Sequence, residues 1–157
     1  MRTAVLALCA LLSIAVVQAQ PEEKTAERVS IIRLVANADA YNGKEIWVTG
    51  YLTLGVERDL LCPSRDAASS LDCLWVELDD GPWESREDER RLRSRQKEWH
   101  IYANQRISMR ATLDTTNTGH LGNTHAALTR VTQVYGRQCQ TSFETASVRR
   151  TCSKRGR

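Results

Sequence analysis

The chain lacks the residue patterns that mark the commonest enzyme and metal sites. Its 157 residues contain three histidines, and no nucleophile elbow, zinc-protease, P-loop or dinucleotide-binding motif occurs among them. The five cysteines form no C-x-x-C pair, which disfavours a zinc site. These absences predict a protein that is not an enzyme and that holds no cofactor and no metal ion.

Long apolar stretches are also scarce, and the clearest one lies at the N-terminus. Ala4–Val17 follows the basic residue Arg2 and leads into a small-residue cleavage pattern at residues 17–19. This order predicts a secretory signal peptide over residues 1–19, because the apolar part is too short for a comfortable membrane span. A retained anchor and a lipoprotein are the alternatives, although Cys9 lies too early for lipid attachment. We therefore expect an exported protein, periplasmic or secreted, with no integral membrane span in the mature chain.

A strong excess of charge of one sign is absent from the chain as a whole. The net charge of +3, from 22 basic and 19 acidic residues, is too small to indicate nucleic-acid binding by itself. The C-terminal segment differs, because no acidic residue follows Glu144. Its basic side chains form a candidate polyanion-binding cluster, with a passive, disordered tail as the alternative. The cluster comprises Arg149, Arg150, Lys154, Arg155 and Arg157.

Four cysteines remain once a signal peptide containing Cys9 is removed. An even number in an exported chain predicts disulfides, for which four cysteines allow three connectivities. We favour the pairings Cys62–Cys73 and Cys139–Cys152, because each pair brackets a polar segment whose ends can meet. Closing loops of this size stabilises a fold by about 2–3 kcal/mol each on the chain-entropy model.

The clearest secondary structure lies in Lys44–Leu54, which alternates apolar and polar residues as a half-buried strand does. Gly50 falls on the inward side, where a glycine indicates a sharp bend or the close approach of another backbone. The inward residues are predicted to be Ile46, Val48, Leu52 and Leu54, and the outward residues Trp47, Thr49, Tyr51 and Thr53.

Further elements follow from the same kind of pattern. A helix is predicted over Thr25–Asn37, capped by Thr25 or Ser30. The charged segment Glu84–Glu98 is predicted to be a solvated helix, with a mobile loop as the alternative. The apolar face of the first helix would comprise Val29, Ile32, Val35 and Ala36. Four more strands are predicted over Leu60–Cys62, Cys73–Leu78, Gln105–Leu113 and Thr124–Tyr135. Alternation slips in the last of these strands, and a β-bulge would explain the slip.

The order of these elements predicts a fold that is mainly β. Five short strands with a helix between the third and the fourth are typical of a five-stranded OB-like barrel. The barrel would carry an N-terminal helix and the charged helical insert. Its domain would span residues 20–136, followed by a basic, disulfide-containing tail over residues 137–157. An open five-stranded α+β sheet is the alternative.

Three segments carry a recognisable pattern. Val29–Leu52 contains A-N-x-x-x-Y-x-G-K followed by V-x-G-Y-L, residues 74–78 read LWVEL, and the loop before Thr124 contains N-x-G-H-x-G. They resemble a family of small, largely uncharacterised bacterial exported proteins. The resemblance implies an OB-type barrel and no established reaction. The matching positions are Asn37, Tyr41, Gly43, Lys44, Val48, Gly50, Asn117, Gly119, His120 and Gly122.

The most distinctive polar element is the loop between the fourth and fifth predicted strands. In an OB barrel this loop borders the usual binding cleft beside strands two and three. We predict ligand contacts from Asn117, Gly119, His120 and Asn123. The alternative is that the glycines supply positive-φ turns while His120 packs or caps the hairpin. A metal site formed by His120 and His125 with a carboxylate such as Asp114, or a hydrolase centred on His120, is a further alternative.

Outward aromatic residues are the second candidate. Trp47, Tyr51 and Trp75 are predicted to lie outside the barrel, where rings can stack on bases or sugars. The alternative is that the N-terminal helix or the charged insert covers them.

These observations lead to three functional hypotheses. The first is a non-enzymatic exported module that binds a small ligand or an unknown protein of the bacterial envelope. The second is an oligonucleotide- or polyanion-binding protein that uses the barrel cleft and the basic tail, with an anionic polymer as its partner. The third is a hydrolase or metal enzyme centred on His120.

Overall fold

The computed structural model describes residues 25–55, 58–67, 71–78, 97–144 and 147–153. The predicted signal peptide lies outside the described residues, as do residues 84–96 of the charged segment. The same holds for three basic positions of the predicted C-terminal cluster, Lys154, Arg155 and Arg157.

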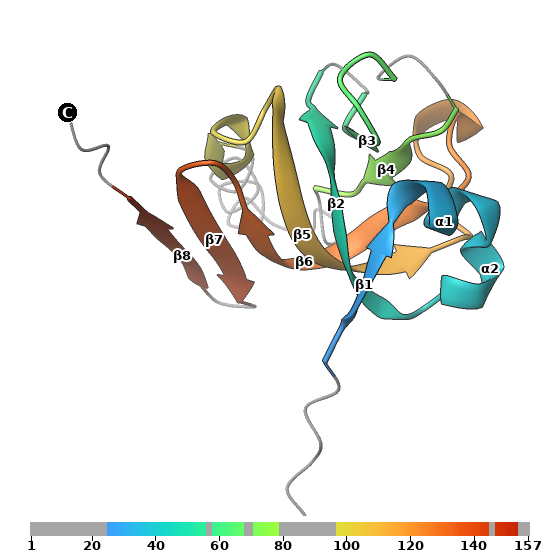
Figure 1. Ribbon diagram of the computed structural model, residues 1–157, viewed down its shortest axis with the longest axis horizontal. Helices are drawn as coiled ribbons and strands as arrows, with labels where there is room; N and C mark the ends of the chain where they lie inside the picture. Colours follow the sequence, from blue (N-terminus) through green and yellow to red (C-terminus); the bar gives the residue numbers. More distant parts are fainter. Residues whose placement is uncertain (1–24, 56–57, 68–70, 79–96, 145–146, 154–157) are drawn as a thin grey trace, which may run out of the picture.

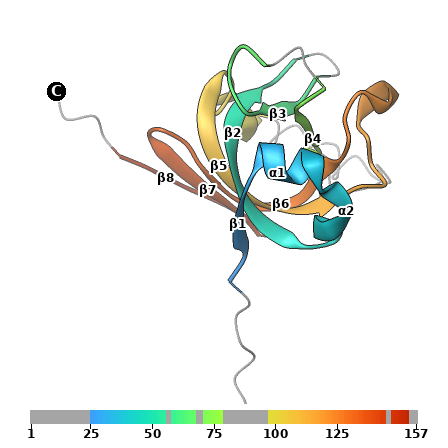
Figure 2. The ribbon, with the colours of Figure 1, turned by 45° about the vertical axis from the view of Figure 1, so that its right-hand side comes forward.

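Five strands close into the predicted OB-like barrel (Figures 1 and 2). They pair in the ring β2–β3–β4–β6–β5–β2, and all contacts are antiparallel except the parallel pair β4–β6. The closed ring rules out the open α+β sheet. The strands are β2 (Glu45–Thr53), β3 (Leu60–Cys62), β4 (Leu74–Val76), β5 (Gln105–Asp114) and β6 (Ala127–Tyr135).

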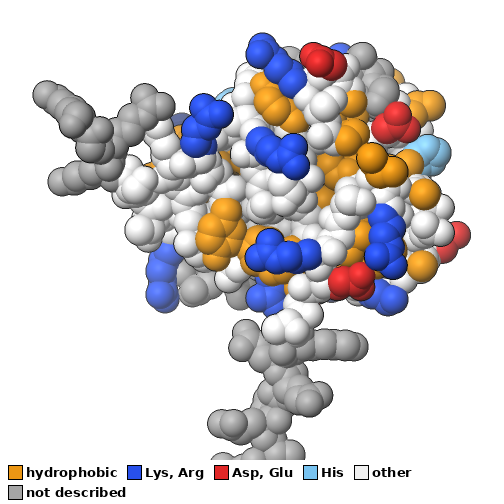
Figure 3. Space-filling model, in the orientation of Figure 1, with side chains coloured by type: hydrophobic (Ala, Val, Ile, Leu, Met, Phe, Trp, Pro, Cys, Tyr) orange, Lys and Arg blue, Asp and Glu red, His pale blue; other side chains and the backbone are white. Residues whose placement is uncertain are grey.

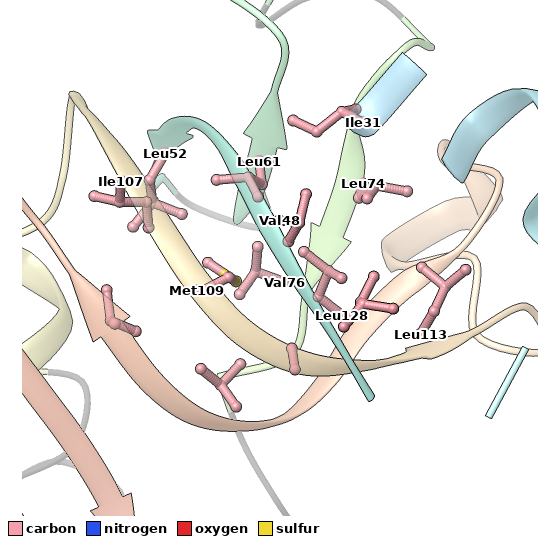
Figure 4. Close-up of a cluster of buried hydrophobic side chains, with 14 of the residues drawn as sticks. Ile31, Val48, Leu52, Leu61, Leu74, Val76, Ile107, Met109, Leu113 and Leu128 are labelled. Atoms are coloured by element: carbon pink, nitrogen blue, oxygen red, sulfur yellow. The ribbon is translucent and has the colours of Figure 1, made fainter. Parts of the chain in front are cut away.

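The predicted alternation of the long strands fills the barrel. On β2 the side chains of Ile46, Val48 and Leu52 are buried, whereas Leu54 lies past the end of the strand and is half-buried. Each fully buried aliphatic side chain contributes about 1.5–3 kcal/mol. Figure 4 shows side chains from all five barrel strands meeting in one cluster. The inward residues of β5 are Ile107, Met109, Ala111 and Leu113.

Gly50 marks the close approach that its position predicted. A Cβ atom at this position would lie 2.7 Å from the carbonyl oxygen of Cys62 and 2.8 Å from Cγ of Leu61. It would also clash with Ile31, the first residue of the N-terminal helix α1 (Ile31–Ala36). The absence of a side chain at Gly50 therefore lets β3 and this helix close on β2.

The N-terminal helix begins later than predicted. Residues 27–30 form β1 (Glu27–Ser30), which pairs in parallel with β2, and α1 (Ile31–Ala36) and α2 (Ala38–Tyr41) follow. Ser30 caps α1 by accepting the N–H of Arg33 at 3.3 Å, as one of the two predicted caps. The predicted apolar face is wrong in part: Val29 is buried and Val35 packs on the core, but Ile32 is 70% exposed, and Ile31 and Leu34 are buried instead. Residues 27–30 are extended because their backbone groups pair with β2. This partner lies far along the chain, so the local helical pattern of the sequence does not reveal it.

The predicted bulge is present in β6. Its pairing with β5 shifts between Arg110 and Thr112, so that residues 129–133 lie opposite residues 110–112. Arg130 sits in the shifted part with φ of 48°. The shift explains why the apolar spacing of β6 departs from strict alternation.

The C-terminal segment adds two strands that the sequence analysis did not predict. β7 (Cys139–Glu144) and β8 (Ser147–Cys152) form a hairpin that continues the sheet from β6 (Figure 1). Residues 97–100 are helical, and Trp99 and Tyr102 are buried beside the hairpin, where Trp99 stacks on Phe143. The segment predicted as a tail is therefore packed on the barrel domain as far as it is described.

Both predicted disulfides are confirmed. Cys62 is bonded to Cys73 and Cys139 to Cys152. Structural disulfides form in oxidising compartments. Within the described ranges, no helix combines the length and the apolar character needed to cross a membrane.

Candidate functional site

The loop over residues 117–123 is held against β4. The side-chain oxygen of Asn117 accepts the N–H of Gly119 at 2.9 Å, and its amide nitrogen donates to Glu77 Oε2 at 2.9 Å. Gly119 has φ of 71° and lies so close to the indole of Trp75 that a Cβ atom would be 2.6 Å from the ring. Asn117 and Gly119 therefore attach the loop to the barrel.

The tip of this loop is exposed. His120 is the first residue of the short η1 (His120–Gly122) and Asn123 follows it, with the Asn123 amide donating to the carbonyl oxygen of His120 at 3.3 Å. Leu121 is 80% exposed. In the described part of the chain, no group of three His, Cys, Asp or Glu side chains is placed to hold a metal ion.

The outer face of β3 and β4, the expected floor of the binding cleft, is covered by the chain itself. The loop closed by the Cys62–Cys73 disulfide folds over this face and forms a small second core with Leu60 and Ala67. Trp75 packs on the same core and is half-buried. No residue of the N-terminal helix belongs to this second core, and most of the charged insert lies outside the described residues.

The three candidate aromatic residues do not form one surface. Trp47 and Tyr51 lie on the outer face of β2, four residues apart, and thus about 13 Å from each other along the strand. The Tyr51 hydroxyl donates to the carbonyl oxygen of Asn104 at 2.6 Å. Trp47 has a different neighbour, Tyr135 of β6, at 5.3 Å between ring centroids. The sequence did not indicate this partner, because the bulge in β6 decides which way Tyr135 points.

The strand register assembles a surface that we call the basic–aromatic face. Residues paired across neighbouring strands point to the same side of a sheet. Two adjacent rows therefore cross the outer side of β1, β2, β5, β6, β7 and β8. The first row comprises Arg28, Trp47, Arg110, Gln133, Ser142 and Arg149. The second row comprises Ser30, Thr49, Ser108, Tyr135, Gln140 and Thr151.

Arginines surround Trp47 on this face. The guanidinium of Arg28 lies 5.6 Å from the centroid of the indole, within range of a cation–π interaction. Arg110 donates to Glu45 at 2.8 Å, and its Nε is buried with no hydrogen-bond partner among the described residues. A hollow of about 300 Å³ is lined by Arg28, Trp47 and Arg110 with residues 25 and 26. Figure 3 shows Lys and Arg side chains spread over the side in view, with Asp and Glu side chains toward its right-hand part.

A polar cleft lies at the junction of β4, β5 and β6. The carboxylate of Asp114 accepts the N–H of Thr116 at 2.8 Å and its hydroxyl at 2.6 Å. These bonds, with a smaller contribution from the charge of Arg130, hold the pKa of Asp114 below its usual value. Glu77 and Arg130, which also line this cleft, could not be predicted from the sequence. They meet only because Glu77 follows the end of β4 and Arg130 lies in the bulge of β6. The cleft has a volume of about 420 Å³ and is lined by Asn42, Gly43, Glu77, Thr112, Leu113, Asp114, Thr116, Thr129 and Arg130.

No family model, curated protein or solved structure matches this chain. The chemistry of the two surfaces must therefore be judged from their residues. The cleft offers positively and negatively charged side chains that can form hydrogen bonds. However, the carboxylates of Asp114 and Glu77 each already accept a hydrogen bond from a side chain of the neighbouring loop. The basic–aromatic face offers guanidinium donors beside an indole ring, a combination that suits an anionic ligand with planar or ring-shaped parts.

Proposed function

We propose that the protein is a non-enzymatic, exported OB-like module of the bacterial envelope, and that its basic–aromatic face binds an anionic polymer. One observation carries this proposal. The register places Arg28, Trp47 and Arg110 on adjacent strands and Arg149 at the far end of the same row. Anionic groups attract guanidinium donors, and rings between those groups can stack on an indole at the surface, such as the half-buried Trp47.

The length of the row favours a polymer over a small molecule. The row crosses six strands, so at roughly 4.8 Å per strand it is about 24 Å wide. Arg28 and Arg110 lie about 10 Å apart on this scale, and Arg149 about 14 Å further on. A small ligand reaches one of these positions, whereas an extended chain reaches all three.

The disulfides support export. Two disulfides in a chain of this size suit an oxidising compartment outside the cytosol. The apolar segment over residues 1–19 supports the same proposal from the sequence. The anionic polymer would accordingly be one that the protein meets outside the cytosol.

The test measures binding of two labelled polyanions to the oxidised protein by fluorescence anisotropy. One is an oligothymidylate of about 15 nucleotides, within the usual range of an OB fold, and the other is linear polyphosphate, which has charge but no rings. Three arginine contacts predict a salt slope near −2, so affinity for the oligonucleotide should fall roughly 20-fold between about 50 and 200 mM NaCl.

Variants then locate the surface. Arg28→Gln should weaken both probes and reduce the salt slope by about 0.7, while Trp47→Ala should weaken only the oligonucleotide, by about 1–3 kcal/mol. Arg65→Gln is the matched control, because Arg65 is an exposed arginine in the Cys62–Cys73 loop. Unchanged binding in both face variants would contradict the proposal. Loss of all binding on deletion of residues 154–157 would assign it to the C-terminal residues instead.

A further inference from the structure

The sheet ends at β8, which leaves one side of that strand open. β8 pairs with β7 and is the last strand in the sheet order, so the described residues place no strand on its other side (Figure 1). Its six residues pair continuously with β7, without a bulge, and contain no proline. An edge of this kind can accept another strand through its backbone groups.

The register identifies the backbone groups that face the open side. The N–H of Ser153 donates to the carbonyl oxygen of Gln138 at 2.9 Å, and the Cα atoms of the next pair, Cys139 and Cys152, lie 4.1 Å apart. This separation fits a pair that does not exchange hydrogen bonds, and such pairs alternate with bonded pairs along an antiparallel ladder. The N–H and C=O groups of Val148, Arg150 and Cys152 therefore point away from β7.

The charges on β8 indicate what the edge accepts. Arg149 is exposed in the middle of the strand, Arg150 beside it keeps a partly exposed side chain in its ion pair with Glu98, and the chain carries further basic residues after Cys152. Two β8 strands paired antiparallel through these outward groups, about the centre of the strand, would bring Arg150 opposite Arg150 of the second copy, and like charges directly opposite destabilise a pair. An added strand with acidic side chains would instead gain attraction at the same positions.

We propose that β8 is a docking edge for an extended acidic segment of a partner protein, bound by strand addition. The backbone of Val148, Arg150 and Cys152 supplies the hydrogen bonds, and the positive charge of Arg149 favours acidic side chains on the added strand. This interaction uses the backbone at the rim of the sheet, whereas the basic–aromatic face uses side chains on the outer side. The two proposals share Arg149, but only strand addition needs the backbone groups of Val148, Arg150 and Cys152, so experiments on those groups separate the two.

The first experiment uses the oxidised wild-type protein and a labelled peptide of alternating Glu and Val, long enough to cover β8. We expect saturable binding in fluorescence anisotropy. A Lys–Val peptide of the same length should bind at least about tenfold more weakly, and so should the Glu–Val peptide methylated at every backbone nitrogen. The methylated peptide keeps its charges but cannot donate backbone hydrogen bonds. Equal binding of the methylated peptide would overturn strand addition, as would no binding of the Glu–Val peptide.

The second experiment alters the edge itself. Val148→Pro removes an N–H that faces the open side, so the bonds to β7 remain and proline is tolerated at an edge. We expect at least about tenfold weaker peptide binding for this variant and a change of at most about threefold for Val148→Ala. Near-ultraviolet circular dichroism checks that the hairpin stays folded. Wild-type affinity in Val148→Pro would overturn the proposal. A dimer of the wild-type protein in sedimentation, lost in Val148→Pro, would also overturn it in favour of a second copy of the chain.

Discussion

The hydroxyl groups of Tyr102 and Thr141 lie 2.7 Å apart in a buried hydrogen bond. This bond joins β7 to the segment that precedes β5. Next to it Trp99 stacks on Phe143 with 5.1 Å between ring centroids, and Arg150 of β8 pairs with Glu98. The C-terminal hairpin is thus attached to the domain by buried polar and aromatic contacts in addition to its pairing with β6.

Removing one partner of this bond should be more harmful than removing both. Thr141→Val leaves the Tyr102 hydroxyl buried without a partner, and we expect the free energy of unfolding to fall by about 1–3 kcal/mol. The double variant Tyr102→Phe, Thr141→Val removes both polar groups and should lose less than Thr141→Val alone. Urea unfolding measures both changes. If the double variant loses as much stability as Thr141→Val and Tyr102→Phe lose together, the two hydroxyl groups are not coupled.

Stability should depend on Tyr102 at alkaline pH. Burial raises the pKa of Tyr102 above 10, although the bond to Thr141 and the charge of Arg150 oppose the rise. Because the folded-state pKa exceeds the unfolded one, the stabilisation is complete below about pH 10 and is lost as pH rises through the folded-state pKa. We expect the wild-type free energy of unfolding to fall more steeply above pH 10 than that of Tyr102→Phe. Parallel curves for the two proteins would contradict this linkage.

Two glycines, Gly43 and Gly119, share a φ of 71° but differ in their surroundings, and Gly119 combines this φ with a ψ of −173°, which only glycine adopts readily. A Cβ atom at Gly43 meets nothing within 4 Å, whereas at Gly119 it enters the Trp75 ring. Gly43→Ala should destabilise the protein by about 1–2 kcal/mol through strain alone. Gly119→Ala should destabilise it by roughly 1–3 kcal/mol more and change the fluorescence of Trp75. Equal losses would mean that the loop can move off Trp75 without penalty.

The two disulfides should be distinguishable by their local effects. Replacing either pair by serines should lower the free energy of unfolding by about 2–4 kcal/mol. Loss of Cys62–Cys73 should also expose Trp75 to a soluble quencher, because that loop covers the outer face of β3 and β4. Loss of Cys139–Cys152 should leave the quenching of Trp75 unchanged. Equal quenching in the two variants would contradict the proposed cover.

Much of the barrel could be predicted because its signals are local. Ile46 and Val48 on β2, and Met109 on β5, alternate with polar residues, since one side of each strand faces the core and the other does not. The disulfide pairing could be predicted for a similar reason, because each pair closes a short loop. The start of α1 could not, since β1 is a strand only through its parallel partner β2.

The candidate site could be predicted only in part. Asn117 and Gly119 were identified as special positions, but their role in holding the loop depends on Glu77 and Trp75, which lie far away in the sequence. The polar cleft likewise depends on where the bulge places Arg130.

Local signals in the sequence were enough to predict which side of β2, β4 and β5 faces inward, to favour the observed cysteine pairing, and to place Gly50 where β2 must lack a side chain. Those properties follow from local periodicity, loop length and the size of a glycine. The tertiary structure alone decided which outward side chains meet. Arg28 and Arg149 come from opposite ends of the chain and share one row with Trp47 because six strands pair in a particular register. That register is set by the buried side of the sheet, so the outer surface is a consequence of the core.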